Sequence, residues 1–371
     1  MTTNRPLRLG MIGGGTGAFM GYVHRIAARL DGNYELVAGA LSSRPDVAQS
    51  SGRALGLADD RIYSDFTEMA RAESTRPDGV EVVAIVTPNH MHVAPARAFL
   101  QAGIHVICDK PLAGSLAEAE ELAAVTPANG ARFLLTHTYT GYPLVRLARD
   151  MVARGDLGTI RMVQVEYAQD WLTVETPDEQ AGTAWRADPA KSGGGGAIAD
   201  IGTHAYNLAR FVSGLQLHSL SADLDSFVPG RRVDDNAHIM LRFQGGAKGM
   251  LWASQVAVGN ENSIRLRVFG DKASLDWQHT QPNELTFTRF GEARQIITRN
   301  GAGSNGMGRI PSGHPEGYLE AFATLYDDFA AVIRTGADRP LPTLADGVEG
   351  MRFITSALAS AQNDARWQPL V

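Results

Sequence analysis

Short apolar runs alternate with helical patterns through residues 7–125, and this alternation constrains the fold more than any other feature of the chain. The runs are almost continuously apolar, which is typical of strands in a parallel sheet with helices on both faces. The predicted strands cover residues 7–12, 34–41, 80–87 and 104–108. The predicted helices cover residues 21–30, 45–55, 93–102 and 115–125. We therefore expect an N-terminal α/β domain built on a parallel sheet.

The pattern changes after residue 140, where the predicted strands become longer and richer in β-branched residues. Residues 158–171 and 237–277 give such strands with partial alternation, which favours an antiparallel sheet. Helical patterns over residues 318–334 and 344–363 close the chain. The sequence thus predicts an N-terminal α/β domain and a C-terminal α+β domain, over residues 1–138 and 139–371.

Composition excludes several classes of protein. With 371 residues, 44% of them hydrophobic and 20% charged, the chain is long enough for two globular domains. A net charge of −6 gives no basic surface for nucleic acid, and no segment approaches the roughly 20 apolar residues of a spanning helix. The start has no signal-peptide pattern, and Cys108, the single cysteine, is interpreted as a small buried hydrophobe. We expect a cytoplasmic protein with no nucleic-acid or membrane partner.

A glycine loop follows the first predicted strand and opens the first helix, the context in which a dinucleotide fingerprint binds pyrophosphate. Glycine lets the backbone approach the phosphates, and the helix N-terminus supplies N–H donors. The sequence is compatible with the strict spacing, ending at Ala18, and with a wider loop ending at Gly21, which fits better with the following helix. The alternative is a turn that binds no ligand. The residues expected at the cofactor are Gly13, Gly15, Thr16, Phe19 and Met20.

The end of the second strand usually carries an acid that binds the adenosine ribose of NAD. Leu41 holds that place here and is followed by Ser42, Ser43 and Arg44. Arg44 can pair with the phosphate of NADP, whereas the serine hydroxyls can equally bind a bare ribose. The sequence therefore predicts NAD or NADP and leaves the preference open.

Four further motifs follow the glycine loop. They read TPNHMH over residues 87–92, AGIHV over 102–106, DKP over 109–111 and GGGAIADIGTH over 194–204. In this order the motifs resemble those of the Gfo/Idh/MocA oxidoreductases, and the resemblance extends to the C-terminal helices. Asp109 replaces the usual glutamate of the third motif, and Asn207 replaces an acid that usually follows the fourth.

The resemblance implies a Rossmann domain, then a domain with a large, mostly antiparallel sheet, and an active site between them. Most members transfer a hydride between a sugar or cyclitol carbinol and NAD(P). By position, Lys110, Asp200 and His204 correspond to the catalytic residues. The family also implies a homodimer or homotetramer formed through the open face of the large sheet. The residues expected to line the nicotinamide are Thr87, Pro88, Asn89, His92, Asp109, Lys110 and Pro111.

Alcohol oxidation gives the three catalytic candidates distinct roles. Lys110 follows a parallel strand, where ligands bind in such sheets, and its ammonium can stabilise the developing alkoxide. Asp200 and His204 are four residues apart, so both project from one side of a helix. His204 is suited to be the general base, and Asp200 can orient it or bind a substrate hydroxyl. The alternatives are a surface lysine, an N-capping aspartate and a core histidine.

Other residues are weaker candidates. Tyr139, like Tyr142 and His137, faces either the cleft or the core. A zinc site is not expected, because the histidines lack a third clustered ligand. The candidates for contact with the substrate are Lys110, Tyr139, Trp171, Trp185, Arg186, Asp200, His204 and His314.

The sequence therefore predicts an NAD(P)-dependent dehydrogenase that oxidises a secondary hydroxyl of an inositol, a hexose or a glycoside. The alternative enzyme is an NAD-dependent glycoside hydrolase that uses transient oxidation on the same fold. A non-catalytic sensor is a third class, but a sensor has no need of Lys110 and His204, which this chain keeps.

Overall fold

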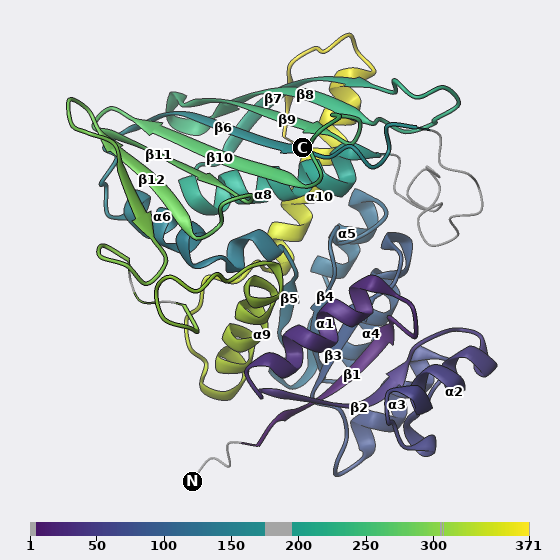
Figure 1. The fold of residues 1–371 in the computed structure, drawn as a ribbon. Helices are drawn as coiled ribbons and strands as arrows, with labels where there is room; N and C mark the ends of the chain where they lie inside the picture. Colours follow the sequence, from purple (N-terminus) through teal and green to yellow (C-terminus); the bar gives the residue numbers. More distant parts are fainter. Residues whose placement is uncertain (1–4, 175–194, 305, 307, 371) are drawn as a thin grey trace. The chain divides into compact units, whose positions relative to one another are not determined.

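The computed structural model describes residues 5–174, 195–304, 306 and 308–370. The chain divides into two compact units, and Figure 1 follows it through both by colour. The first unit contains Met1–Thr138 and Phe322–Val348, and the second contains Tyr139–Ala321 and Glu349–Val371. Among the residues described, no helix is both long and apolar enough to cross a membrane.

A five-stranded parallel sheet forms the centre of the first unit, with the strand order β2-β1-β3-β4-β5. The predicted parallel sheet is confirmed. Val82, Val83, Ala84 and Ile85 of the central strand are fully buried, which explains why this run is continuously apolar. The strands are β1 (Leu7–Gly13), β2 (Tyr34–Ala40), β3 (Val82–Val86), β4 (His105–Cys108) and β5 (Phe133–Leu135).

The helices of the first unit alternate with its strands, as predicted, but the sequence analysis missed α3. That helix begins at Asp65, whose carboxylate accepts the backbone N–H groups of Thr67 and Glu68, each at 2.8 Å. The helices are α1 (Phe19–Leu30), α2 (Pro45–Ala54), α3 (Phe66–Thr75), α4 (Val93–Gln101) and α5 (Leu116–Ala123).

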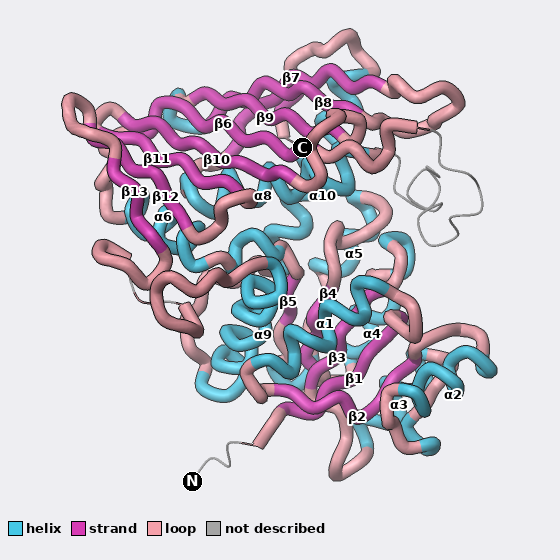
Figure 2. Tube along the Cα trace, viewed as in Figure 1, coloured by secondary structure: helices cyan, strands magenta, loops and turns pink. Residues whose placement is uncertain are grey.

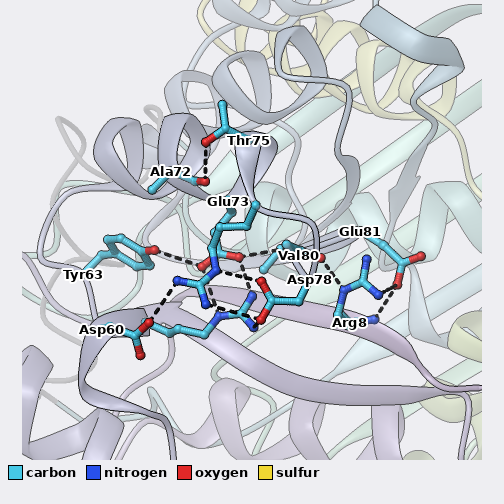
Figure 3. Close-up of polar contacts among 12 residues, drawn as sticks. Arg8, Asp60, Tyr63, Ala72, Glu73, Thr75, Asp78, Val80 and Glu81 are labelled. Carbon is cyan, nitrogen blue, oxygen red and sulfur yellow. Dashed lines mark hydrogen bonds and ion pairs between the residues drawn. The ribbon is translucent and has the colours of Figure 1, made fainter.

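A buried ionic cluster fixes α3 beside the chain that enters β3 (Figure 3). Glu73 is 1% exposed and forms an ion pair with the guanidinium of Arg61. Its carboxylate also accepts from the Tyr63 hydroxyl at 2.9 Å and from the Val80 N–H at 3.0 Å. Burial and the bond to Glu73 raise the pKa of Tyr63 to about 12. The buried charge of Glu73 is therefore compensated by a guanidinium, a hydroxyl and a backbone N–H group of the same unit.

A nine-stranded sheet forms the second unit, with the strand order β13-β12-β11-β10-β6-β9-β8-β7-β14 (Figure 2). β6 and β9 pair in parallel, and the other described pairings are antiparallel, so the predicted mostly antiparallel sheet is confirmed. The strands are β6 (Ile160–Ala168), β7 (Leu217–Asp225), β8 (Asn236–Phe243), β9 (Lys248–Ser254), β10 (Ser263–Gly270), β11 (Ala273–Gln278), β12 (Glu284–Arg289), β13 (Gln295–Thr298) and β14 (Gln368–Pro369).

One face of this sheet is covered by helices. α6 (Pro143–Ala153) and α8 (Thr203–Ser213) pack against it (Figure 1). The strand residues that alternate with the buried ones point to the other face, which we call the open face. Met162, Met240 and Met250 lie on it, each 46% to 53% exposed, and Met240 pairs directly with Met250. Two long helices, α9 (Tyr318–Thr335) and α10 (Leu344–Ala361), lie near the C-terminus as predicted, before β14, and most of α9 belongs to the first unit.

Candidate active site

The glycine loop of the first unit lies where the strand order reverses. β1 and β3 are neighbours in the sheet although β2 separates them in the sequence, and ligands bind at such a switch point. Gly13 and Gly14 have φ angles of +72° and +69°, which favour glycine. A Cβ at Gly21 would lie 2.3 Å from the carbonyl oxygen of Gly14, so α1 packs closely on the loop. This close packing favours the wider register, and the loop has the glycine cradle that a pyrophosphate needs.

The other residues expected at the loop are more exposed. Thr16 donates its backbone N–H to Ser51 Oγ at 3.2 Å. Phe19 is 69% exposed, and Met20 is half-buried. Phe19 and Met20 begin α1, whose N-terminal N–H groups are the donors that a phosphate would use.

An acid is present near the end of β2, but it lies beyond the position of Leu41, where the ribose-binding acid is usually found. Asp46 lies in the first turn of α2 and accepts from the Arg44 guanidinium at 2.9 Å. Both side chains are exposed, and the guanidinium lowers the pKa of Asp46. Ser42 Oγ accepts the backbone N–H of Arg44 at 3.1 Å. The cation that could pair with the phosphate of NADP is thus already paired with a carboxylate.

His92 connects the two loops expected at the nicotinamide. Its Nδ1 lies 2.7 Å from the carbonyl oxygen of Pro111, and its Nε2 lies 2.8 Å from that of Thr87. Burial lowers the pKa of His92, against the charge of Asp109 and the two carbonyls. A neutral imidazole has one N–H, so it donates to one of these carbonyls at a time. His92 therefore has a positioning role in this unit.

Lys110 lies two residues beyond β4, at the carboxyl end of the parallel sheet. Asp109 Oδ1 accepts from the backbone N–H of Lys110 at 3.0 Å and from Thr136 Oγ1 at 2.8 Å. The peptide bond between Lys110 and Pro111 is cis. The carboxylate of Asp109 thus holds the backbone from which the Lys110 side chain projects.

Asp200 and His204 lie in the second unit, on a short π-helical segment, Ile198–Gly202, and on the first turn of α8. Such π-helical turns are frequent at functional sites. Another residue, Asp234, performs the capping: its carboxylate accepts from the N–H groups of Gly196 at 2.6 Å and Ile198 at 2.7 Å. Burial raises the pKa of Asp234 to about 6. The alternative of an N-capping Asp200 is therefore wrong.

Polar and aromatic side chains of the second unit surround this pair. The ring of Tyr139 meets the ring of His204 edge-on, with 5.1 Å between the centroids. The Tyr139 and Tyr167 hydroxyls are hydrogen-bonded to each other, and Tyr167 donates to Asn262 Oδ1 at 2.8 Å. Asp200 Oδ2 accepts from Gln255 Nε2 at 2.9 Å. The arrangement provides an imidazole and a carboxylate beside hydroxyl and amide groups, which suits a polyhydroxylated ligand.

The sequence analysis missed Tyr167, Gln169, Gln255 and Asn262. A signal exists for two of them, because Gln169 and Gln255 each directly follow a strand, β6 and β9. These strands pair in parallel with Ala168 opposite Ser254, so the two glutamines emerge side by side. The sequence alone does not reveal this pairing.

The remaining candidates fall into three groups. Tyr142 and His137 are buried, and Cys108 is buried as expected. Trp171 is 36% exposed, and its indole N–H donates to Gln169 Oε1 at 3.0 Å. His314 is exposed, and its backbone carbonyl accepts from Arg299. Trp185 and Arg186 lie outside the described residues.

Comparisons with known proteins cover both units. The family model described as "Oxidoreductase family, NAD-binding Rossmann fold" matches residues 7–137. The model of the GFO/IDH/MocA C-terminal domain matches residues 145–276.

Several similar proteins have known structures or activities. An oxidoreductase from Sinorhizobium meliloti is 52% identical, with a TM-score of 0.90 and coverage of 98% of this chain and 99% of that one. An inositol dehydrogenase homologue from Azotobacter vinelandii, complexed with NADH and myo-inositol, is 35% identical, with a TM-score of 0.90 and coverage of 98% of each chain. The levoglucosan dehydrogenase of Pseudarthrobacter phenanthrenivorans is 29% identical over 303 residues, 75% of each chain.

Proposed function

The chain belongs to the Gfo/Idh/MocA family of NAD-binding oxidoreductases, and from this premise we propose that it oxidises a secondary hydroxyl of a cyclitol or sugar. As a member of this family, the protein is an oxidoreductase that binds NAD or NADP. The observation that carries the substrate class is the polar cluster around Asp200 and His204, with its hydroxyl and amide groups. These groups match a ring that carries several hydroxyls.

Each catalytic candidate has a defined task in this proposal. His204 takes the proton of the reacting hydroxyl, because an imidazole titrates near neutral pH. The ammonium of Lys110 stabilises the developing alkoxide. Asp200 orients His204 and accepts a hydrogen bond from the substrate. The bound nicotinamide supplies the hydride acceptor.

The substrate class also rests on similarity. The homologue from Azotobacter vinelandii binds myo-inositol, and the relative from Pseudarthrobacter phenanthrenivorans is named for levoglucosan. Both compounds are polyhydroxylated rings. We therefore place inositols and pyranoses first among the compounds to test, with the exposed Trp171 as an aromatic contact to the ring. Tyr139 is 3% exposed, so its ring packs beside His204 instead.

The glycine loop and the loops joined by His92 are the proposed cofactor site. Gly13, Gly15 and the N-terminus of α1 would hold the pyrophosphate, while Thr87 and Asn89 would lie at the nicotinamide. The Arg44–Asp46 pair lies near the end of β2, where the adenosine ribose binds in such folds.

We also propose that the protein forms a homodimer or homotetramer through the open face of the nine-stranded sheet. The exposed methionines Met162, Met240 and Met250 give this face an apolar stripe. Met240→Lys would place a charge in the interface and is expected to reduce the molar mass measured by light scattering to that of a smaller assembly.

The direct test is nicotinamide reduction by purified protein with NAD or NADP and a panel of inositols, hexoses and glycosides. Lys110→Ala and His204→Ala are each expected to reduce kcat/KM about 10²-fold or more, while the cofactor still binds. Wild-type protein that reduces neither cofactor with any compound would overturn the proposal. Turnover that survives both substitutions would reject the assigned roles.

A further inference from the structure

A continuous hydrogen-bonded chain of uncharged side chains ends at the Asp200 carboxylate. Gln255 Nε2 donates to Asp200 Oδ2 at 2.9 Å and to Gln169 Oε1 at 3.3 Å. Gln169 Nε2 in turn donates to Asn262 Oδ1 at 2.7 Å. The chain continues from Asn262 to the hydroxyls of Tyr167 and Tyr139, whose ring meets His204.

The indole of Trp171 sets the direction of this chain. An indole N–H can only donate, so Gln169 Oε1 is fixed as an acceptor and its amide nitrogen must point to Asn262. Gln255 is then oriented with its nitrogen toward both Gln169 Oε1 and Asp200. The carboxylate oxygen at the end of the chain can only accept. The network therefore fixes Oδ2 of Asp200 as a hydrogen-bond acceptor.

The backbone keeps Gln255 in place. Gln255 directly follows β9, is 2% exposed, and donates its backbone N–H to the carbonyl oxygen of Asp235 at 2.8 Å. Gln169 directly follows the parallel neighbour β6 and donates its backbone N–H to the carbonyl oxygen of Ser254 at 2.7 Å. The donor to Asp200 is thus held by sheet register rather than by a loop.

We propose that Gln255 is a positioning residue that clamps the Asp200 carboxylate in the orientation in which it acts on His204 and the substrate. This inference rests on the proposed function, since it assigns Asp200 a part in the reaction. Gln255 touches neither His204 nor a reacting atom by this account. Asp200 is its direct partner, so we expect its effect on the rate to pass through Asp200 rather than along the longer route through Gln169.

A double-substitution cycle with Gln255→Met and Asp200→Ala tests the clamp without any substrate. Methionine keeps the length of the side chain and removes the donor. If the two side chains are coupled, the two single substitutions together lower the urea midpoint of unfolding by more than the double substitution does. Additive midpoints would overturn the clamp. Gln244→Met is the matched control, because Gln244 is exposed at the opposite end of β9, in the turn Gln244–Gly246.

The same variants test the effect on the reaction. Gln255→Met is expected to lower kcat on the order of 10-fold in the wild-type background, and less than about 2-fold in the Asp200→Ala background. Equal losses in both backgrounds would indicate a merely structural role and reject the proposal. Gln244→Met is expected to leave kcat unchanged.

Gln255→Glu tests the contact through the pH dependence of the reaction, which a loss of packing alone would not shift. It places a second carboxyl beside Asp200, and two adjacent carboxyls share one proton. The acid limb of the kcat/KM profile should therefore move to higher pH, whereas Gln244→Glu should not move it. An unshifted profile would contradict the proposal.

The outcomes separate the two proposals. If Gln255 and Asp200 are coupled in unfolding but the wild type shows no turnover, the proposed function is rejected and the clamp stands. If the wild type turns over substrate but the two residues are not coupled, the clamp alone is rejected.

Discussion

Glu73 of the first unit and Asp200 of the second are both held by side-chain donors, but they are held differently. Glu73 is 1% exposed and is surrounded by Arg61, Tyr63 and the N–H of Val80 (Figure 3). Asp200 is half-buried, and the donor at its Oδ2 is the neutral amide of Gln255. One charge is paired with a guanidinium inside its own cluster, whereas the other receives the neutral amide of Gln255 at one of its oxygens.

This difference is the one expected between a structural acid and the acid proposed to act in the reaction. A carboxylate paired with a guanidinium has little remaining capacity to respond to a ligand, and removing it deprives a buried cation of its nearest counter-charge. A carboxylate fixed by an amide keeps its charge and its geometry available to a neighbouring histidine. We therefore expect the two acids to contribute to different measurements.

The largest expected effect is on stability, from Glu73→Gln. Loss of the charge leaves the buried Arg61 guanidinium with the exposed carboxylate of Asp78, 3.6 Å away, as its remaining counter-charge, so the free energy of unfolding should fall by up to about 3–5 kcal/mol. Asp200→Asn should instead lower kcat/KM about 10²-fold or more, with a change in unfolding free energy below about 1 kcal/mol. Urea denaturation and nicotinamide reduction on the same preparations measure both.

Asp59→Asn is the control for the first variant. It removes a carboxylate of similar chemistry from the exposed Arg53–Asp59 pair of the same unit, where solvent screens the charges and the pair contributes little to stability. If Glu73→Gln lost no more stability than Asp59→Asn, the buried cluster would not have the structural role assigned here. If Asp200→Asn lost stability and kept its activity, the comparison would be reversed.

Asp234 sharpens the comparison, because it is a buried acid that accepts from two backbone N–H groups. Burial raises its pKa from 3.8 to about 6, so between these values the native state binds more protons than the unfolded state. The contribution of Asp234 to the free energy of unfolding should therefore fall as the pH rises from about 4 to about 6, by up to about 3 kcal/mol.

The measurement is urea denaturation of the wild type and of Asp234→Asn across this pH range. The asparagine does not titrate, so the wild type should lose stability relative to the variant as the pH increases. A difference that stayed constant, or that changed in the opposite direction, would show that the two N–H donors outweigh burial at this carboxylate.

The sequence revealed the parts of the molecule whose signals are local. Strands buried on both faces have continuous apolar runs, so the parallel sheet could be predicted, and the fourth motif set Asp200 and His204 on one helix. The helix α3 was missed because its sequence, FTEMARAEST, is mostly polar. Gln255 reaches Asp200 through the pairing of β6 with β9, and this register depends on strands far apart in the chain. Long-range register has no local sequence signal, so half of the polar cluster was not predicted.

The smallest expected effect concerns the exposed Arg44–Asp46 pair, which is the opposite extreme from Glu73. Both side chains are about 70% exposed, so solvent screens the pair and the Arg44 guanidinium is held weakly. Asp46→Ala removes the carboxylate that competes with a 2′-phosphate for Arg44, at the end of β2 where the adenosine ribose binds in such folds. The ratio of kcat/KM for NADP to that for NAD should rise about 2- to 5-fold, with stability unchanged. Asp59→Ala changes the net charge equally elsewhere on the same unit and should leave this ratio constant. A ratio that fell in Asp46→Ala would instead show that Asp46 repels no phosphate and that Arg44 does not serve this end of the cofactor.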